Sequence, residues 1–190
     1  MLFIILILIA WIIIFTFNFF FNISISILNN IVCVVLSTIA VVLIDAILAI
    51  VTHRVPESKI DVLNKKYQVA NSEKRFYEKL GIKKWKDHVP ELGRLANFSK
   101  AKVEEPKNPS YTEKFLKEII YGRWDHFLSG ILGFLIIPIF LPFSNSVWIT
   151  LPVSIVNLIL NFMCLAVLRY NFVKILVLHK YNLKNVQKGE

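Results

Sequence analysis

The stretch Glu118-Ile-Ile-Tyr-Gly-Arg-Trp-Asp-His126 is the point from which the fold of this chain can be worked out. It is the last polar stretch before an apolar run, and it holds two carboxylates, a tyrosine, an arginine and a histidine. Two apolar runs and a long basic segment precede it, and two more apolar runs with a basic tail follow. This order predicts a membrane protein whose polar middle brings reactive side chains to the bilayer surface.

The composition also favours a membrane protein over a soluble domain. Hydrophobic residues make up 56% of the 190 residues, and the formal charge is +9. Such a basic chain binds nucleic acid or an anionic membrane face, and its uncharged apolar blocks favour the membrane. Cys33 and Cys164 both lie in apolar runs, which indicates buried thiols rather than a disulfide framework or a zinc site. We therefore expect no nucleic-acid partner and no metal.

Four apolar runs have a length typical of membrane spans, about residues 2–21, 31–51, 127–143 and 147–168. The first run has no Lys or Arg before it and no small-residue cleavage site after it, so we interpret it as a retained span rather than a signal peptide. Short uncharged links join the runs in pairs. The predicted fold is an all-α membrane protein with four transmembrane helices arranged as two hairpins.

The basic residues predict the orientation of these helices. Residues 52–126 hold 17 Lys and Arg against 11 Asp and Glu, and residues 169–190 hold five against one. The positive-inside rule places both segments, and so both termini, in the cytoplasm. The predicted parts are a hairpin (1–51), a basic cytoplasmic helical insertion (52–126), a second hairpin (127–168) and a tail (169–190) with an interfacial helix.

The polar middle contains signals for helices and loops. Val62–Leu80 has apolar residues at near-helical spacing, and Asn71-Ser72-Glu73 is a candidate cap for a helix that Gly81 would end. Glu104–Pro109 is predicted to be a loop because it holds two prolines, and Thr112–Trp124 is predicted to be a helix.

Trp85 lies among Lys83, Lys84 and Lys86. This pattern suits the lipid headgroup layer, where indole rings and basic side chains both settle. It also suits the phosphates of an anionic donor, and the sequence leaves both interpretations open.

Polar residues inside the apolar runs are candidates for function. Asp45 is the one charge in its span; it either serves a site or pairs near the interface with a basic neighbour such as Arg54. Asn157 and Asn161 are four residues apart, so they share a helix face that points into the bundle. The third run is irregular because it holds residues that permit close packing or a kink: Gly130, Gly133, Pro138 and Pro142.

Five motifs together resemble a known family: His53-Arg54-Val55-Pro56, Lys84-Trp85-Lys86-Asp87, Glu118 followed by His126, Asn161, and Arg169-Tyr170-Asn171. Their order and spacing are similar to those of the glycosyl-4,4'-diaponeurosporenoate acyltransferase family of bacterial carotenoid (staphyloxanthin) biosynthesis. The resemblance covers about residues 45 to 180. The chain departs from the family's usual pattern at Tyr121, Arg123, Phe127 and Leu168.

The resemblance implies transfer of a fatty acyl group to a hydroxyl of a glycolipid or other membrane-bound acceptor, not necessarily a carotenoid glycoside. It implies an acyl donor such as acyl-CoA or acyl-carrier protein, no other cofactor, lipid partners and a place in the bacterial cytoplasmic membrane. It assigns catalysis to His126 and Glu118. The residues it assigns to substrate binding are Asn161, Arg169, Tyr170, Asn171, Trp85, Lys86 and Arg54.

Acyl transfer to an alcohol needs a base for the hydroxyl and stabilisation of the developing oxyanion. Histidine suits the first task, and Arg169 and Asn161 are candidates for contacts with the acyl carbonyl or the acceptor headgroup. On a helix Asp125 points about 100° away from His126, and Glu118 is offset by ~80°, so both are poor orienters. Asp45, from another span, is a possible orienter.

Other functions need residue patterns that differ from those of this chain. A membrane cysteine peptidase needs a thiol beside a polar partner, a phosphatidyl-alcohol transferase needs several aspartates on one span, and a small glycerol-phosphate acyltransferase needs glycine- and serine-rich loops. The chain has none of these patterns. The remaining alternative is a non-catalytic membrane scaffold or lipid-binding partner. A catalytic site predicts that His126, Glu118, Asn161 and Arg169 converge, whereas a scaffold predicts that they are scattered.

Overall fold

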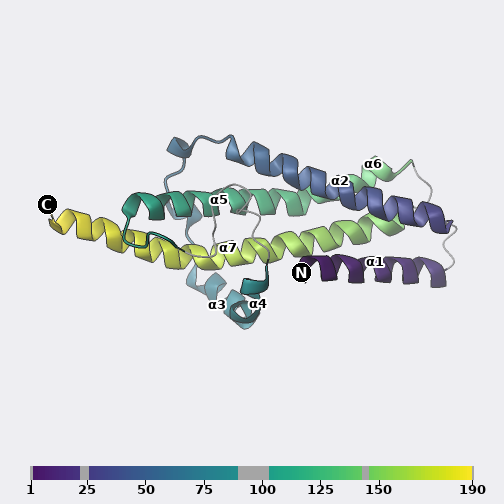
Figure 1. The fold of residues 1–190 in the computed structure, drawn as a ribbon, viewed down its shortest axis with the longest axis horizontal. Helices are drawn as coiled ribbons and strands as arrows, with labels where there is room; N and C mark the ends of the chain where they lie inside the picture. Colours follow the sequence, from purple (N-terminus) through teal and green to yellow (C-terminus); the bar gives the residue numbers. More distant parts are fainter. Residues whose placement is uncertain (1, 22–25, 90–102, 143–145, 190) are drawn as a thin grey trace. The chain divides into compact units, whose positions relative to one another are not determined.

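The computed structural model describes residues 2–21, 26–89, 103–142 and 146–189. Every regular element within them is helical, which confirms the predicted all-α class (Figure 1). The α-helices are α1 (Leu2–Phe20), α2 (Ile27–His53), α3 (Asn71–Lys79), α4 (Ile82–Trp85), α5 (Pro109–Leu132), α6 (Ile136–Phe140) and α7 (Val147–Gly189). The short 3-10 helices are η1 (Glu57–Lys59), η2 (Lys65–Tyr67), η3 (Lys86–His88) and η5 (Gly133–Leu135).

Three segments are long and apolar enough to cross a membrane: Ile27–His53, Pro109–Phe140 and Val147–Lys188. The apolar part of α1, Ile4–Phe20, is shorter. The whole of α1 has 19 residues, a rise of about 28 Å against about 30 Å of hydrocarbon. The structure therefore supports three membrane helices, and the fourth span and the two-hairpin topology stay predictions.

Two predicted boundaries are absent from the helices. α5 begins at Pro109 and passes through His126 without a break, and α7 continues for 43 residues past Arg169-Tyr170-Asn171, which we expected to close a span. In Figure 1 α7 is one uninterrupted ribbon that ends in yellow. α5 passes through Gly122 and Gly130 without a break, and ending a helix leaves four carbonyl groups without partners. A helix can therefore continue where the polarity of its side chains changes.

The polar middle matches the sequence in part. α3 begins at Asn71 and stops before Gly81, whose φ of 69° is the left-handed conformation that glycine favours. The N-cap position, however, is Ala70, and no side chain caps the helix. Residues 62–70 form turns and η2 rather than a helix. The predicted loop ends where α5 starts, at Pro109, a position where the missing N–H costs nothing.

The chain divides into two compact units. The first unit comprises Met1–Val51 and Asp125–Met163, and the second comprises Thr52–Trp124 and Cys164–Glu190. The buried core of the first unit draws on four helices and consists of Ile14, Val34, Val41, Ile136, Phe140, Ile149 and Val153. Many apolar side chains of α1 and α2, such as Ile12 and Ile47, are exposed instead. Such exposure is expected where lipid replaces water around a helix.

Glycines allow close packing in the first unit, as the sequence predicted. A Cβ added to Gly133 would lie 2.3 Å from Nδ2 of Asn157, and one added to Gly130 would lie 3.2 Å from Cδ1 of Leu158. η5 and the end of α5 therefore approach α7 closely at these positions, and the break of the helix at Gly133 confirms the irregular third run.

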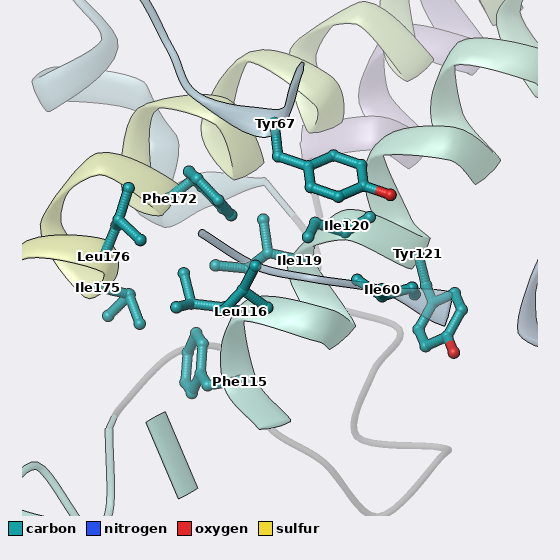
Figure 2. Close-up of a cluster of buried hydrophobic side chains, with 11 residues drawn as sticks. Ile60, Tyr67, Phe115, Leu116, Ile119, Ile120, Tyr121, Phe172, Ile175 and Leu176 are labelled. Carbon is teal, nitrogen blue, oxygen red and sulfur yellow. The ribbon is translucent and has the colours of Figure 1, made fainter. Parts of the chain in front are cut away.

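The second unit has its own core, which Figure 2 shows in close-up. Leu116, Ile119 and Ile120 of α5 pack with Phe172 and Leu176 of α7. Ile60 and Tyr67 from the segment after α2 belong to the same cluster. Burial of these apolar side chains holds α5, α7 and the segment after α2 together.

Candidate active site

A chain of polar side chains lies in the first unit and joins three of its helices. Nδ1 of His126 on α5 lies 2.9 Å from Oδ1 of Asn161 on α7. Nδ2 of Asn161 in turn donates to Oδ2 of Asp45 on α2, at 3.3 Å. Asn161 is buried, whereas His126 and Asp45 are partly exposed. The amide of Asn161 thus links the imidazole to the carboxylate.

The hydrogen bonds of Asn161 assign the tautomer of His126. The Asn161 amide nitrogen faces acceptors only, namely Oδ2 of Asp45 and the backbone and side-chain oxygens of Asn157 at 3.1 and 2.9 Å. Its carbonyl oxygen must then face His126, so Nδ1 of His126 carries the proton and donates it. In the neutral ring the lone pair is on Nε2. Nε2 has no hydrogen-bond partner among the described residues.

Further hydrogen bonds fix Asn157 and Ser129 beside this chain. Nδ2 of Asn157 donates to the backbone oxygen of Ser129 at 3.0 Å, and Oγ of Ser129 donates to Oδ1 of Asp125 at 3.3 Å. Asn157 and Ser129 are both buried. Buried polar side chains whose hydrogen-bonding groups are paired with one another keep a single arrangement. Asp125 therefore accepts a hydrogen bond from Ser129, which lies one turn further along α5.

The structure brings together three of the predicted site residues: His126, Asn161 and Asp45. Of the two interpretations of Asp45, the structure shows a bond to Asn161, while Arg54 is an exposed residue of the second unit. Among the described residues, no cluster of three His, Cys, Asp or Glu side chains has the geometry to hold a metal ion.

Glu118 lies in the second unit. Its Oε2 is 3.6 Å from Nε2 of His53, and the ring of His53 stacks on Tyr121 with centroids 4.9 Å apart. The hydroxyl of Tyr121 donates to the backbone oxygen of Val55 at 2.6 Å. These contacts connect Glu118 to the end of α2, and its predicted catalytic role stays a prediction.

Arg169 also lies in the second unit, where it forms an ion pair with Glu73. Its Nε and Nη2 donate to the two carboxylate oxygens, with 2.6 Å between Nη2 and Oε2. The hydroxyl of Tyr77 adds a bond of 2.6 Å to Oε1 of Glu73. Burial opposes ionisation of Glu73, but the bonds from Arg169 and Tyr77 outweigh it and hold its pKa below the usual value. Burial, and then the bond to Glu73, raises the pKa of Tyr77 to about 12.

The other predicted binding residues of the second unit have varied surroundings. Tyr170 is in a buried cluster against which Trp85 packs, and the indole N–H of Trp85 donates to the backbone oxygen of Leu80. Lys86 pairs with its neighbour Asp87. Asn171 is half-buried. Substrate binding by these residues stays a prediction.

Several residues that are prominent in the structure have only weak signals in the sequence. Ser129 follows Asp125 by four residues, a spacing that places the two on one helix face. Glu73 and Tyr77 have the same spacing. No such local pattern indicates that Glu73 meets Arg169, which is 96 residues away.

The comparison with known families extends over most of this region. The family model described as glycosyl-4,4'-diaponeurosporenoate acyltransferase matches residues 60–180. The chain belongs to this family. No curated protein and no solved structure matches the chain. The match confirms the resemblance drawn from the motifs, and the family's description names acyl transfer as its activity. His126 and Asn161 of this acyltransferase lie inside the matched residues, whereas Asp45 lies before them.

Proposed function

We propose that the chain is a membrane-embedded acyltransferase that moves a fatty acyl group to a hydroxyl of a glycolipid or other lipid-like acceptor, with His126 as the base. The observation that carries this proposal is the bond from Nδ1 of His126 to Asn161, which is itself bonded to Asp45. This arrangement leaves Nε2 as the proton acceptor, in a chain whose family transfers acyl groups.

The reaction uses Nε2 of His126 twice. First, Nε2 takes the proton of the acceptor hydroxyl while the hydroxyl oxygen attacks the carbonyl carbon of an acyl thioester, such as acyl-CoA or acyl-carrier protein. The new carbon–oxygen bond forms and the carbon–sulfur bond breaks. His126 then returns the proton to the departing thiolate, so the imidazole is neutral again at the end of the cycle.

Asn161 and Asp45 act on His126 in this scheme as positioning residues. Asn161 holds the ring in one orientation and one tautomer, which keeps Nε2 directed at the acceptor. When His126 becomes positive, the carboxylate of Asp45 favours that charge through the polarised amide of Asn161. The carboxylate, amide and imidazole therefore work as one unit.

A lipid-like acceptor suits the surroundings of this unit. The helices that bear His126, Asn161 and Asp45 are the three that are long and apolar enough to cross a membrane. Exposed apolar side chains such as Phe127 and Phe162 flank them in the first unit. An acceptor with an apolar chain enters such surroundings at little cost, and its hydroxyl is the part that needs a polar partner.

The test is acyl transfer per folded molecule in proteoliposomes, with radiolabelled acyl-CoA and a long-chain alkyl glucoside as acceptor. His126→Ala should lower turnover on the order of 10²–10⁴-fold. His126→Gln should be nearly as poor, because an amide cannot accept the proton. His88→Ala, at an exposed histidine of the second unit, is the matched control. A folded His126→Ala variant with near-normal turnover would remove histidine base catalysis.

The non-catalytic scaffold is favoured by a different observation. Arg169 is held by Glu73 and Glu118 contacts His53, so these two predicted site residues already have protein partners. A scaffold predicts that changes at His126 alter only expression or assembly, and that lipid product falls in step with the amount of folded protein. The proteoliposome assay separates the two because it counts turnover per folded molecule.

A further inference from the structure

The second unit holds a buried arginine that the proposed reaction does not use. Arg123 on α5 is only 7% exposed. Its Nη1 donates to the backbone oxygen of Tyr67 at 2.7 Å, and its guanidinium lies 5.2 Å from the ring centroid of Phe172. Tyr67 and Phe172 both appear in Figure 2. These are neutral partners for a group that carries a full positive charge.

Arg123 has no carboxylate partner within the part of the chain that the structure describes. Among the described residues no Asp or Glu oxygen lies within 4.0 Å of its guanidinium. Arg169 and Glu73 are within electrostatic range, but both oxygens of Glu73 are bonded to Arg169. Two guanidinium groups therefore share one carboxylate, and the cluster keeps one positive charge. A buried charge without a counterion is expensive, so the arrangement favours an anion from outside.

The guanidinium also has donors to spare. A guanidinium offers five N–H donors in a planar fork, and one bond to the described residues is present. Its other nitrogens are not among the completely buried side-chain atoms that lack a partner, so they keep some exposed surface. A planar fork of free donors matches the oxygens of a phosphate, which it can contact with two parallel bonds.

We propose that Arg123, with Arg169 beside it, binds a phosphate ester. Phosphate is the anion to expect at the polar ends of membrane helices in a chain of charge +9. It has two sources, the headgroup of a phospholipid and the phosphates of a soluble acyl donor. Binding itself does not depend on the acyl-transfer proposal; only the assignment to a donor rests on it.

The test is binding to the full chain, purified in an uncharged maltoside detergent, followed by native mass spectrometry and calorimetric titration. The probes are dihexanoyl phosphatidate, the uncharged dihexanoylglycerol and coenzyme A. We expect saturable binding of one phosphate-bearing probe, at least tenfold tighter than that of dihexanoylglycerol and weakened by salt. Tight phosphatidate binding assigns the site to a lipid, and tight coenzyme A binding assigns it to the donor.

Variants connect this binding to the arginine. Arg123→Gln should weaken binding of the phosphate probe roughly ten- to hundred-fold, the effect of losing charge-assisted hydrogen bonds. Arg75→Gln, which removes an exposed arginine on α3, should leave binding unchanged. Glu73→Gln should strengthen binding, because it frees the guanidinium of Arg169.

Several results would overturn the proposal. One is a wild-type protein that binds both phosphate probes no more tightly than dihexanoylglycerol. Another is equal binding by Arg123→Gln and Arg75→Gln. If Arg123→Gln does not fold, Arg123→Lys replaces it: that variant keeps the charge but loses the fork, so unchanged binding would contradict a bidentate contact. Weaker binding by Glu73→Gln would show that Arg123, Arg169 and Glu73 only stabilise the fold.

Discussion

Replacing Asn161 by leucine should break the polar chain of the first unit at its centre. The side chain of Asn161 forms hydrogen bonds with His126, Asp45 and Asn157, at distances between 2.9 and 3.3 Å. Leucine has nearly the same volume but can make none of these bonds. The variant therefore tests the hydrogen bonds rather than the packing.

The magnitude follows from the groups that lose a partner. Each buried polar group left without a hydrogen bond costs about 1–3 kcal/mol. Oδ1 of Asp45 is buried without a hydrogen-bond partner among the described residues, and Oδ2 loses the bond from Asn161, so we expect a loss of about 3 kcal/mol in unfolding free energy. Asn182→Leu, on the same helix, removes one bond of 2.8 Å to the backbone oxygen of Pro106 and should cost about 1 kcal/mol.

The assay has two parts, thermal unfolding in detergent and acyl transfer per folded molecule in proteoliposomes. Asn161→Leu should also lower turnover on the order of 10²-fold, because the ring of His126 is no longer held in one orientation. Asn182→Leu should leave turnover per folded molecule unchanged. Equal destabilisation by the two variants would refute the network argument, and wild-type turnover in folded Asn161→Leu would refute the positioning role.

Three further predictions follow. Gly133→Ala should lower the melting temperature, because its Cβ would meet the amide of Asn157 at 2.3 Å. Gly130→Ala, whose Cβ would lie 3.2 Å from the side-chain atom Cδ1 of Leu158, should lower it less, and equal melting temperatures would contradict the close approach. Glu73 has a lowered pKa, so its contribution to stability should be complete above its ordinary pKa of 4.5 and should disappear as pH falls below that value. Tyr77 has a pKa raised to about 12, so it should stabilise the fold below pH 10 and less above it. Melting temperatures measured over a pH series check both; a wild-type series that is flat in both windows, or a series that Glu73→Gln leaves unchanged, would contradict this. Both termini should be cytoplasmic, so a cysteine at Asn29 should react with an impermeant thiol reagent added to intact cells and one at Lys107 should not; the reverse pattern would overturn the orientation.

The sequence predicted the features that depend on local spacing. Asn157 and Asn161 share a face because they are four residues apart, and the structure shows them bonded to each other. Gly81 ended α3 for the same kind of local reason. His126 was assigned from the family resemblance, which rests on the motif of Glu118 followed by His126. Each inference needed no knowledge of which helices are neighbours.

The sequence could not predict partners that are distant along the chain. Asp45 and Asn161 are 116 residues apart, and the rotation of α2 against α7 that brings them together depends on the whole core of the first unit. The same holds for Arg169, which was expected to face a substrate and is bonded to Glu73. The expected end of a helix at Arg169 failed for another reason: the change from apolar to basic side chains marks a change of surroundings, and a helix satisfies its own backbone in either.

Asp45 lies outside the residues that the family model matches. The matched residues 60–180 contain the base candidate and its amide partner, so the bond between His126 and Asn161 lies wholly inside the family region. The carboxylate comes from α2, before that region. In a low-dielectric site an imidazolium without a nearby negative charge is costly, so a base held by an amide alone would be weaker than one held by an amide and a carboxylate. In the proposed mechanism, α2 therefore supplies the charge that stabilises the imidazolium of His126.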